Sequence, residues 1–314
     1  MIADFQMYHV PVLLAECIDA LAIRPDGTYV DATLGGGGHL KNIIANLSGK
    51  GLAVGIDRDP NAISYCKEIL TGPGCKVVLV QSPFSQISKV LAANNINAVD
   101  GVLLDLGVSS HQIDEANRGF SYMQNAALDM RMDQTCGETA AQLLINSDEE
   151  TLASILSSYG EITNPARMAK AIKAYAVNNP LETSADLRAC LKAEYGPNLP
   201  IKVFAKVFQA IRIAVNDELN EISQCLEGAL KSLKIGGRLA VISYHSLEDR
   251  IVKMFIRAKE QSCTCPPRIP YCICNGKTML KRINKKVIVP SDAEIQNNPR
   301  SRSAKLRIAQ KVGD

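Results

Sequence analysis

Three aspartates in the first third of the chain have the spacing to hold a ligand that carries both an amino group and a ribose. Asp31 precedes a run of glycines, Gly35–Gly38, in the pattern Asp-x-x-x-Gly-x-Gly. A glycine-rich turn lets the backbone approach a ligand closely. Asp57 lies twenty residues beyond Gly37, and an acid there can accept both hydroxyls of a ribose. Asp105 ends a further apolar run and completes the set.

The glycine run also separates two classes of nucleotide ligand. A dinucleotide fingerprint has a third glycine three residues after the second, and Leu40 stands at that position. The spacing of Asp31 suits a ligand with an amino-acid end and no pyrophosphate, so S-adenosylmethionine fits better than NAD. For any single acid the alternative is a helix cap or a turn carboxylate, and Asp59-Pro60 after Asp57 is itself a fair helix start.

One aromatic residue follows the third apolar run. Phe84 stands in Ser-Pro-Phe-Ser, where its ring could pack on an adenine face. Packing in the core is the alternative, and it is the more common fate of a phenylalanine.

The elements that must position these residues alternate between short apolar strands and helices. The strands are nearly continuous in Val, Ile and Leu, as parallel strands covered on both faces are. This alternation predicts an α/β fold with right-handed βαβ units and a doubly wound sheet, whose strand ends outline a ligand crevice. We expect strands at 28–33, 52–57, 76–80 and 99–106, with helices at 39–47 and about 61–70.

The strand pattern stops at Ser110, and helical patterns separated by prolines follow to about Lys202. This predicts an all-helical insert. Residues 1–110 and 203–314 would form one domain, and residues 111–202 the insert, which we expect to recognise the substrate. We further expect a long helix at about 203–233 ended by Gly236-Gly237, a strand at 238–244, a helix through 258, and weaker strands at 285–289 and 304–309.

The composition is that of an ordinary globular chain, with 46% hydrophobic and 21% charged residues among 314. It has neither an apolar run of transmembrane length nor a signal-peptide pattern. Of its ten cysteines, Cys17, Cys66, Cys190 and Cys225 stand singly in apolar stretches, as buried thiols in a reducing compartment do. We therefore expect a cytoplasmic protein.

Charge is unevenly distributed, although the net charge is only +3. From Cys263 to Asp314 there are eleven basic and three acidic residues, a net +8, so the rest of the chain sums to −5. A basic tail on a mildly acidic body favours a polyanionic partner. A solvated tail without a partner is the alternative.

Four more cysteines, Cys263, Cys265, Cys272 and Cys274, form two Cys-x-Cys pairs in a proline-rich loop. Four thiolates so close together could hold a structural zinc ion. The usual zinc signature has two residues between paired ligands, however, and here there is one. Reduced thiols and a disulfide are the alternatives, so we assign no metal ligand.

A longer pattern becomes recognisable at Asp105-Leu-Gly-Val-Ser-Ser-His-Gln112. It belongs to a series of segments in order along nearly the whole chain, at 9–16, 31–39, 55–59, 100–110, 118–121, 128–133, 159–161, 211–219, 243–250 and 298–303. Together these segments closely resemble the bacterial 16S ribosomal RNA cytosine-N4 methyltransferase family, the type called RsmH or MraW. The resemblance implies a class I S-adenosylmethionine-dependent methyltransferase with a Rossmann-like sheet and an inserted helical domain. It also implies a cofactor site lined by Gly37, Gly38, His39, Asp57, Phe84, Asp105 and Gln112.

The resemblance further implies a substrate. This is a cytidine in the decoding region of 16S ribosomal RNA in the small ribosomal subunit, methylated on its exocyclic N4 amine. The expected partner is therefore that RNA. A homodimer is left open, and no membrane partner is expected.

The amine of cytosine is a poor nucleophile because its lone pair is delocalised, so the enzyme must align the transfer, exclude water and accept the amine hydrogens. Many amino-group methyltransferases use an Asp/Asn-Pro-Pro-aromatic turn, and Asp105-Leu-Gly-Val-Ser109-Ser110 lacks both prolines and the aromatic. We expect Asp105 or a backbone carbonyl of this turn to accept the hydrogens, assisted by Ser109 or Ser110. The alternative is that Asp105 only holds the cofactor.

Basic side chains are candidates for contacts with RNA. His245, after the fifth strand, could contact a flipped base or the RNA backbone, or it could cap the next helix. Arginines and a lysine could instead be ordinary surface charges. The candidate phosphate contacts are Arg131, Arg250, Arg300, Arg302 and Lys305.

Two other classes of function are alternatives for a sequence of this kind. An NAD-linked oxidoreductase would use a similar sheet, but the missing third glycine argues against it. A non-catalytic RNA-binding assembly factor would have no need of the acids and glycines of a cofactor site.

Overall fold

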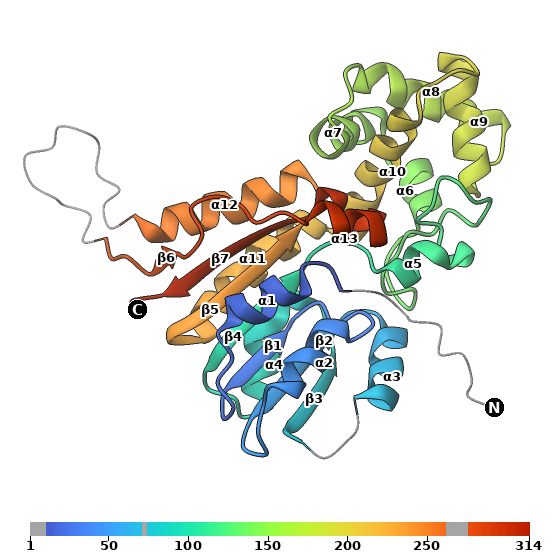
Figure 1. Cartoon of the computed structure of the whole chain (residues 1–314). Coiled ribbons are helices and arrows are strands. Elements are labelled where there is room, and N and C mark those ends of the chain that lie inside the picture. The colour runs from blue at the N-terminus through green and yellow to red at the C-terminus, as the bar shows by residue number, and fades with distance from the viewer. Residues whose placement is uncertain (1–10, 71–73, 262–275) are drawn as a thin grey trace, which may run out of the picture. The chain divides into compact units, whose positions relative to one another are not determined.

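The computed structural model describes residues 11–70, 74–261 and 276–314 (Figure 1). They fall into two compact units. The sheet unit comprises the chain up to Gly107 together with Leu219–Asp314, and the helical unit is Val108–Glu218. No helix in the described ranges combines the length and the apolar character needed to cross a membrane.

A seven-stranded sheet in the order β3-β2-β1-β4-β5-β7-β6 forms the centre of the sheet unit (Figure 1). Strands β1 to β5 run parallel, and β7 is antiparallel to both of its neighbours. The strand order reverses between β1 and β4, and ligands of open α/β sheets bind at such a point. The strands are β1 (Thr28–Asp31), β2 (Leu52–Asp57), β3 (Lys76–Gln81), β4 (Val99–Asp105), β5 (Leu233–Ser243), β6 (Leu280–Arg282) and β7 (Lys305–Lys311).

Helices cover both faces of the sheet. Successive strand residues point to opposite sides, so neighbouring residues of one strand belong to different cores. Val102 and Leu104 of β4 join one core with α4, α11 and α12, whereas Leu103 joins a second core with α1, α2 and α3. The expected α/β fold with a mostly parallel sheet is confirmed. The helices of this unit are α1 (Leu14–Leu21), α2 (Gly38–Ala45), α3 (Pro60–Ile69), η1 (Phe84–Gln86), α4 (Ile87–Ala93), α11 (Glu218–Ser232), α12 (Ser246–Glu260), α13 (Asp292–Asn297) and η3 (Pro299–Ser303).

The helical unit has a hydrophobic core of its own, in which Leu156, Ile172 and Phe208 are buried. Thr139 and Thr183 begin two of its helices with reciprocal capping boxes. The helical content of this segment agrees with the pattern in the sequence. Its helices are α5 (Ser110–Asp114), η2 (Ala116–Arg118), α6 (Ala140–Asn146), α7 (Glu149–Gly160), α8 (Pro165–Asn178), α9 (Ser184–Tyr195) and α10 (Ile201–Asn216).

The return of the chain to the sheet differs from the prediction. The single helix expected at 203–233 is wrong: α10 ends at Asn216, Asp217 takes a left-handed conformation with φ 51°, and α11 follows. The apolar face of α10 packs in the helical core, so the compact helical unit runs to Glu218 rather than stopping at residue 202. The expected break at Gly236-Gly237 is also wrong, because β5 begins at Leu233 and continues through both glycines.

The C-terminal strands differ in detail as well. The strand expected at 285–289 is reduced to an isolated bridge between Ile288 and Leu306. The strand expected at 304–309 is present as β7, which runs on to Lys311. Its pairing partner β6 was not predicted, because three residues are too few to show an apolar alternation.

Candidate functional site

The three aspartates lie at one edge of the sheet. Asp31, Asp57 and Asp105 are the last residues of β1, β2 and β4, which are parallel neighbours. Asp31 pairs in register with Gly55 of β2 and with Leu103 of β4. The negative charges of Asp105 and Asp57 both raise the pKa of Asp31, so the three carboxylates form one electrostatic cluster.

The glycine turn after β1 is tied to the end of β2. Gly35 has φ 49° and Gly37 has φ 73°, a left-handed region that glycine adopts without strain. The Gly35 N–H donates to Asp57 Oδ2 at 2.7 Å. A Cβ atom on Gly37 would lie 2.8 Å from Cys66 Sγ, and one on Gly38 would lie 2.4 Å from Pro11 Cγ. Close packing against the protein itself therefore requires these glycines, in addition to any approach of a ligand.

Asp31 is almost fully buried, with 1% of its surface exposed. Its Oδ1 accepts the Thr33 N–H at 3.2 Å, whereas the buried Oδ2 has no hydrogen-bond partner among the described residues. Burial raises the pKa of Asp31 to about 6. A buried carboxylate oxygen without a donor is costly unless a ligand supplies one. The ammonium group of a methionine moiety is such a donor, so Asp31 fits S-adenosylmethionine.

Asp57 has donors at both oxygens. In addition to Gly35, the Asp59 N–H donates to Asp57 Oδ1 at 2.8 Å. Burial nevertheless raises the pKa of Asp57 to about 6. Because each carboxylate oxygen has two lone pairs, Asp57 can still accept ribose hydroxyls. Asp59 caps α3 by accepting the Asn61 N–H at 3.0 Å, which is the helix start weighed for this segment.

Asp105 is held by residues from three other segments. Its Oδ1 accepts the Tyr244 hydroxyl at 2.8 Å, and its backbone N–H donates to Thr33 Oγ1 at 2.6 Å. Its Oδ2 lies 3.8 Å from Nδ1 of His39. Burial raises the pKa of Asp105 to about 7. Tyr244 was not assigned a role from the sequence, although it directly follows the strand next to β4 and so reaches the same sheet edge.

His39 is buried in the first turn of α2. Its Nε2 lies 3.0 Å from the Val12 carbonyl oxygen, which can only accept, so Nε2 carries the proton and donates. Burial lowers the pKa of His39, which favours the neutral ring. The side chain therefore anchors α2 to the segment before α1.

Phe84 opens η1, just after β3. Its ring is half-buried and packs against the core that contains α4 and α11. The ring therefore packs in the core, as the alternative reading expected. Part of it remains exposed, so a contact with adenine is still possible.

Ser109 and Gln112 belong to the helical unit, where they form a reciprocal cap at the start of α5. The Gln112 N–H donates to Ser109 Oγ at 3.2 Å, and the Ser109 N–H donates to Gln112 Oε1 at 3.1 Å. The Ser109 hydroxyl can still donate its own proton.

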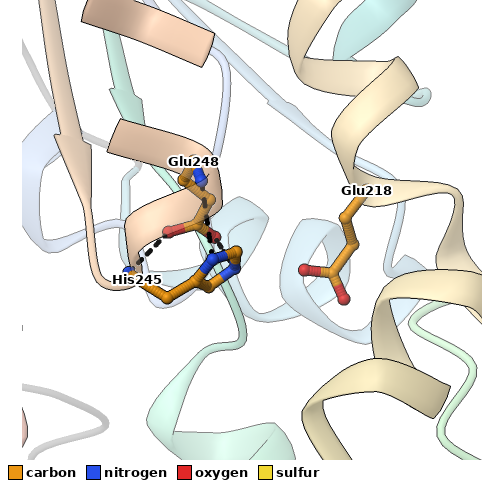
Figure 2. A group of neighbouring side chains, drawn as sticks. All are labelled: Glu218, His245 and Glu248. Carbon is orange, nitrogen blue, oxygen red and sulfur yellow. Dashed lines mark hydrogen bonds and ion pairs between the residues drawn. The ribbon is translucent and has the colours of Figure 1, made fainter. Parts of the chain in front are cut away.

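His245 is the N-cap of α12, in a reciprocal cap with Glu248 (Figure 2). Glu248 Oε2 accepts the backbone N–H groups of Tyr244 at 2.7 Å and His245 at 3.2 Å. The His245 ring lies 3.0 Å from the other oxygen of Glu248. Of the two alternatives for His245, the structure contains the helix cap. Glu218, also labelled in Figure 2, belongs to the helical unit, where Arg212 holds it with two hydrogen bonds.

The candidate phosphate contacts differ in their surroundings. Arg131 makes a bidentate pair with Asp129, with 2.8 and 2.9 Å contacts, which occupies much of its guanidinium. Lys305 lies 4.0 Å from Asp249. The remaining three, Arg250, Arg300 and Arg302, are exposed. The cysteine array Cys263, Cys265, Cys272 and Cys274 lies outside the described residues.

Comparison with known proteins gives consistent matches. A model of the MraW methylase family matches residues 6–312. A protein of Clostridioides difficile (strain 630) named ribosomal RNA small subunit methyltransferase H is 46% identical, covering 98% of this chain and all of the relative. A protein of the same name from Symbiobacterium thermophilum is 45% identical, covering 97% of each. The crystal structure of an rRNA methylase from Streptococcus thermophilus aligns at 10% identity over 97% of this chain and 99% of that one, with a TM-score of 0.43.

Proposed function

The chain belongs to the MraW methylase family, and from this premise we propose that it methylates the exocyclic N4 amine of a cytidine in the decoding region of 16S ribosomal RNA. It is a methyltransferase that uses S-adenosylmethionine. Two relatives carry the name ribosomal RNA small subunit methyltransferase H, which supports RNA of the small ribosomal subunit as the substrate. The proposal goes beyond these names in specifying cytidine as the base and N4 as the methylated amine. For an enzyme that works on ribosomal RNA, we expect a cytoplasmic location.

One observation carries the cofactor part of the proposal: three carboxylates meet beside a glycine turn at the point where the strand order reverses. Asp31 would hold the ammonium group of the methionine moiety, because its Oδ2 is buried without a donor among the described residues. Asp57 would accept the ribose hydroxyls. The other proposed contacts are Gly37, Gly38, His39, Phe84, Asp105 and Gln112.

Bound S-adenosylmethionine supplies a methyl group that its sulfonium already activates. The chain has to orient the amine, exclude water and receive a proton. We assign the proton to Asp105, whose carboxylate lies at the same sheet edge and can accept an N–H of the amine. Its pKa of about 7 suits an acceptor that works near neutral pH. Ser109 would assist by orienting the base through the hydroxyl proton that its capping role leaves free.

The helical unit and the basic C-terminal segment are proposed to recognise the RNA around the target. Residues 111–202 lie within the helical unit. Arg250, Arg300 and Arg302 are the stronger candidates for phosphate contacts, because their side chains are exposed, whereas that of Arg131 is only 20% exposed. The proposal does not require a homodimer.

Replacing Asp105 with Asn separates its two possible roles. We expect methyl transfer to fall at least about 100-fold, while the affinity for S-adenosylhomocysteine changes only a few-fold. Asp100 offers a matched control, since it is a buried carboxylate on the same strand but at the opposite end. Asp100→Asn should leave transfer per folded enzyme unchanged. If affinity and transfer fall together in Asp105→Asn, Asp105 only holds the cofactor.

The substrate is tested with labelled methyl groups. Small subunits and naked 16S RNA from cells that lack the gene are incubated with the enzyme and labelled S-adenosylmethionine, and the digested RNA is examined by mass spectrometry. We expect label in N4-methylated cytidine at one site in the decoding region. Label on another base, or on a ring carbon, would contradict the proposal.

A further inference from the structure

Tyr244 contacts the carboxylate that the proposed reaction uses. It directly follows β5, whose Ile242 pairs in register with Asp105 of β4. This pairing brings the phenol across to the aspartate, and its hydroxyl donates to Oδ1 at 2.8 Å. Among the described residues, Tyr244 is the one side chain that donates a hydrogen bond to this carboxylate. The hydroxyl thus fixes one oxygen of Asp105 and leaves Oδ2 without a donor of its own.

The other titratable groups around Asp105 do not provide this stabilisation. Glu248 of α12 adds negative charge that raises the pKa of Asp105. Asp31 of β1 and Cys17 of α1 are coupled to the same charge, since Asp105 raises the pKa of each. His39 of α2 lies 3.8 Å from Oδ2, beyond hydrogen-bond distance, and burial favours its neutral form.

We propose that Tyr244 is a positioning residue for methyl transfer, which fixes Oδ1 of Asp105, directs Oδ2 to the acceptor and stabilises the ionised carboxylate. A phenol hydrogen bond to a carboxylate stabilises the ionised form, because the bond is stronger when the acceptor is charged. Removing it should therefore raise the pKa of Asp105. The part of the inference that concerns transfer rests on the proposed function; the coupling of Tyr244 to Asp105 does not.

The test compares Tyr244→Phe with a matched hydroxyl deletion. Tyr29 is another buried tyrosine, whose hydroxyl accepts the Arg24 N–H at 2.8 Å at a different part of the unit. Tyr29→Phe therefore controls for the loss of a buried hydroxyl. Carboxyl carbons of aspartate are labelled with ¹³C, the Asp105 signal is assigned by its loss in Asp105→Asn, and its titration midpoint is measured without cofactor. The pH dependence of methyl transfer at saturating substrates is measured in parallel, and thermal melting checks that each variant is folded.

In Tyr244→Phe the Asp105 midpoint should rise by about one pH unit, the size expected for a hydrogen bond to a charged group. The midpoint pH of the acid limb in the transfer profile should rise by the same amount. At a given pH on that limb, the rate of transfer should therefore be about tenfold lower. Tyr29→Phe should change neither the Asp105 titration midpoint nor the pH profile of methyl transfer. An unchanged Asp105 midpoint in folded Tyr244→Phe overturns the inference, and so does a moved midpoint with an unmoved transfer profile. Failure of the wild-type enzyme to methylate RNA would instead refute the proposed function, while the midpoint still decides the coupling.

Discussion

The backbone N–H of Gly35 donates to Oδ2 of Asp57 at 2.7 Å, so the turn after β1 is anchored on the carboxylate at the end of β2. One side chain therefore shapes the glycine turn and forms the proposed ribose contact. Changes at Asp57 should disturb both.

Asp57→Asn should lower cofactor affinity and stability together. An amide can present an oxygen to only one of the two N–H groups, from Gly35 and Asp59, that the carboxylate accepts. We expect the Kd for S-adenosylhomocysteine, measured by calorimetry, to rise roughly 10- to 100-fold, with a lower melting temperature. Asp59→Asn is the control, because Asn caps a helix as well as Asp does. Loss of affinity without loss of stability would show that the turn does not depend on Asp57.

Asp31 should make the cofactor-free protein less stable as the pH rises. Its pKa is about 6 in the folded protein and about 3.9 when unfolded, so the folded state binds more protons between those values. The free energy of unfolding of the wild type, relative to Asp31→Asn, should therefore fall as pH rises from about 4 to about 6 and then level off. Urea unfolding of both proteins at several pH values measures this difference. A difference that does not vary with pH would contradict the burial of an ionised Asp31.

His245→Ala should destabilise α12 without a specific loss of catalysis. The His245 side chain accepts the Glu248 N–H at the first turn, and loss of an N-cap costs about 1 kcal/mol of unfolding free energy. His245→Asn, which keeps a capping side chain, should restore most of that stability. Denaturant unfolding gives the stabilities, and transfer per folded enzyme gives the activities. If both variants keep wild-type stability but lose transfer equally, His245 contacts the RNA rather than the helix.

Asp100 should contribute to stability and not to cofactor binding. It is 4% exposed and accepts hydrogen bonds from the Thr28 N–H and from Lys234 Nζ, each at 2.8 Å, and from Arg24. These partners lower its pKa despite its burial. We expect Asp100→Ala to reduce the free energy of unfolding by about 2 kcal/mol, less than for a fully buried pair because both cations are partly exposed. The affinity for S-adenosylhomocysteine, measured on the folded variant, should stay at the wild-type value.

Local sequence patterns determined the first strands and the acids that end them. The run at 52–57 is β2 as predicted, and the run at 99–106 is β4 with one residue fewer. A continuous run of Val, Ile and Leu indicates a strand buried on both faces, and a run of glycines indicates a turn. Neither indication depends on distant parts of the chain. The placing of Asp31, Asp57 and Asp105 at one sheet edge followed from this alternation, because parallel strands end on the same side.

Tertiary structure alone decided the features that depend on distant partners. The apolar spacing runs through Asp217 without a break, and two helices form because α10 and α11 pack in different cores. Likewise, β5 extends through Gly236, against the local tendency of glycine, because Leu233 and Arg238 on either side of it both pair with β4. Tyr244 reaches Asp105 across 139 residues, and this contact exists only because β4 and β5 pair. Strand order is set by long-range packing, which a local pattern of residue types does not contain.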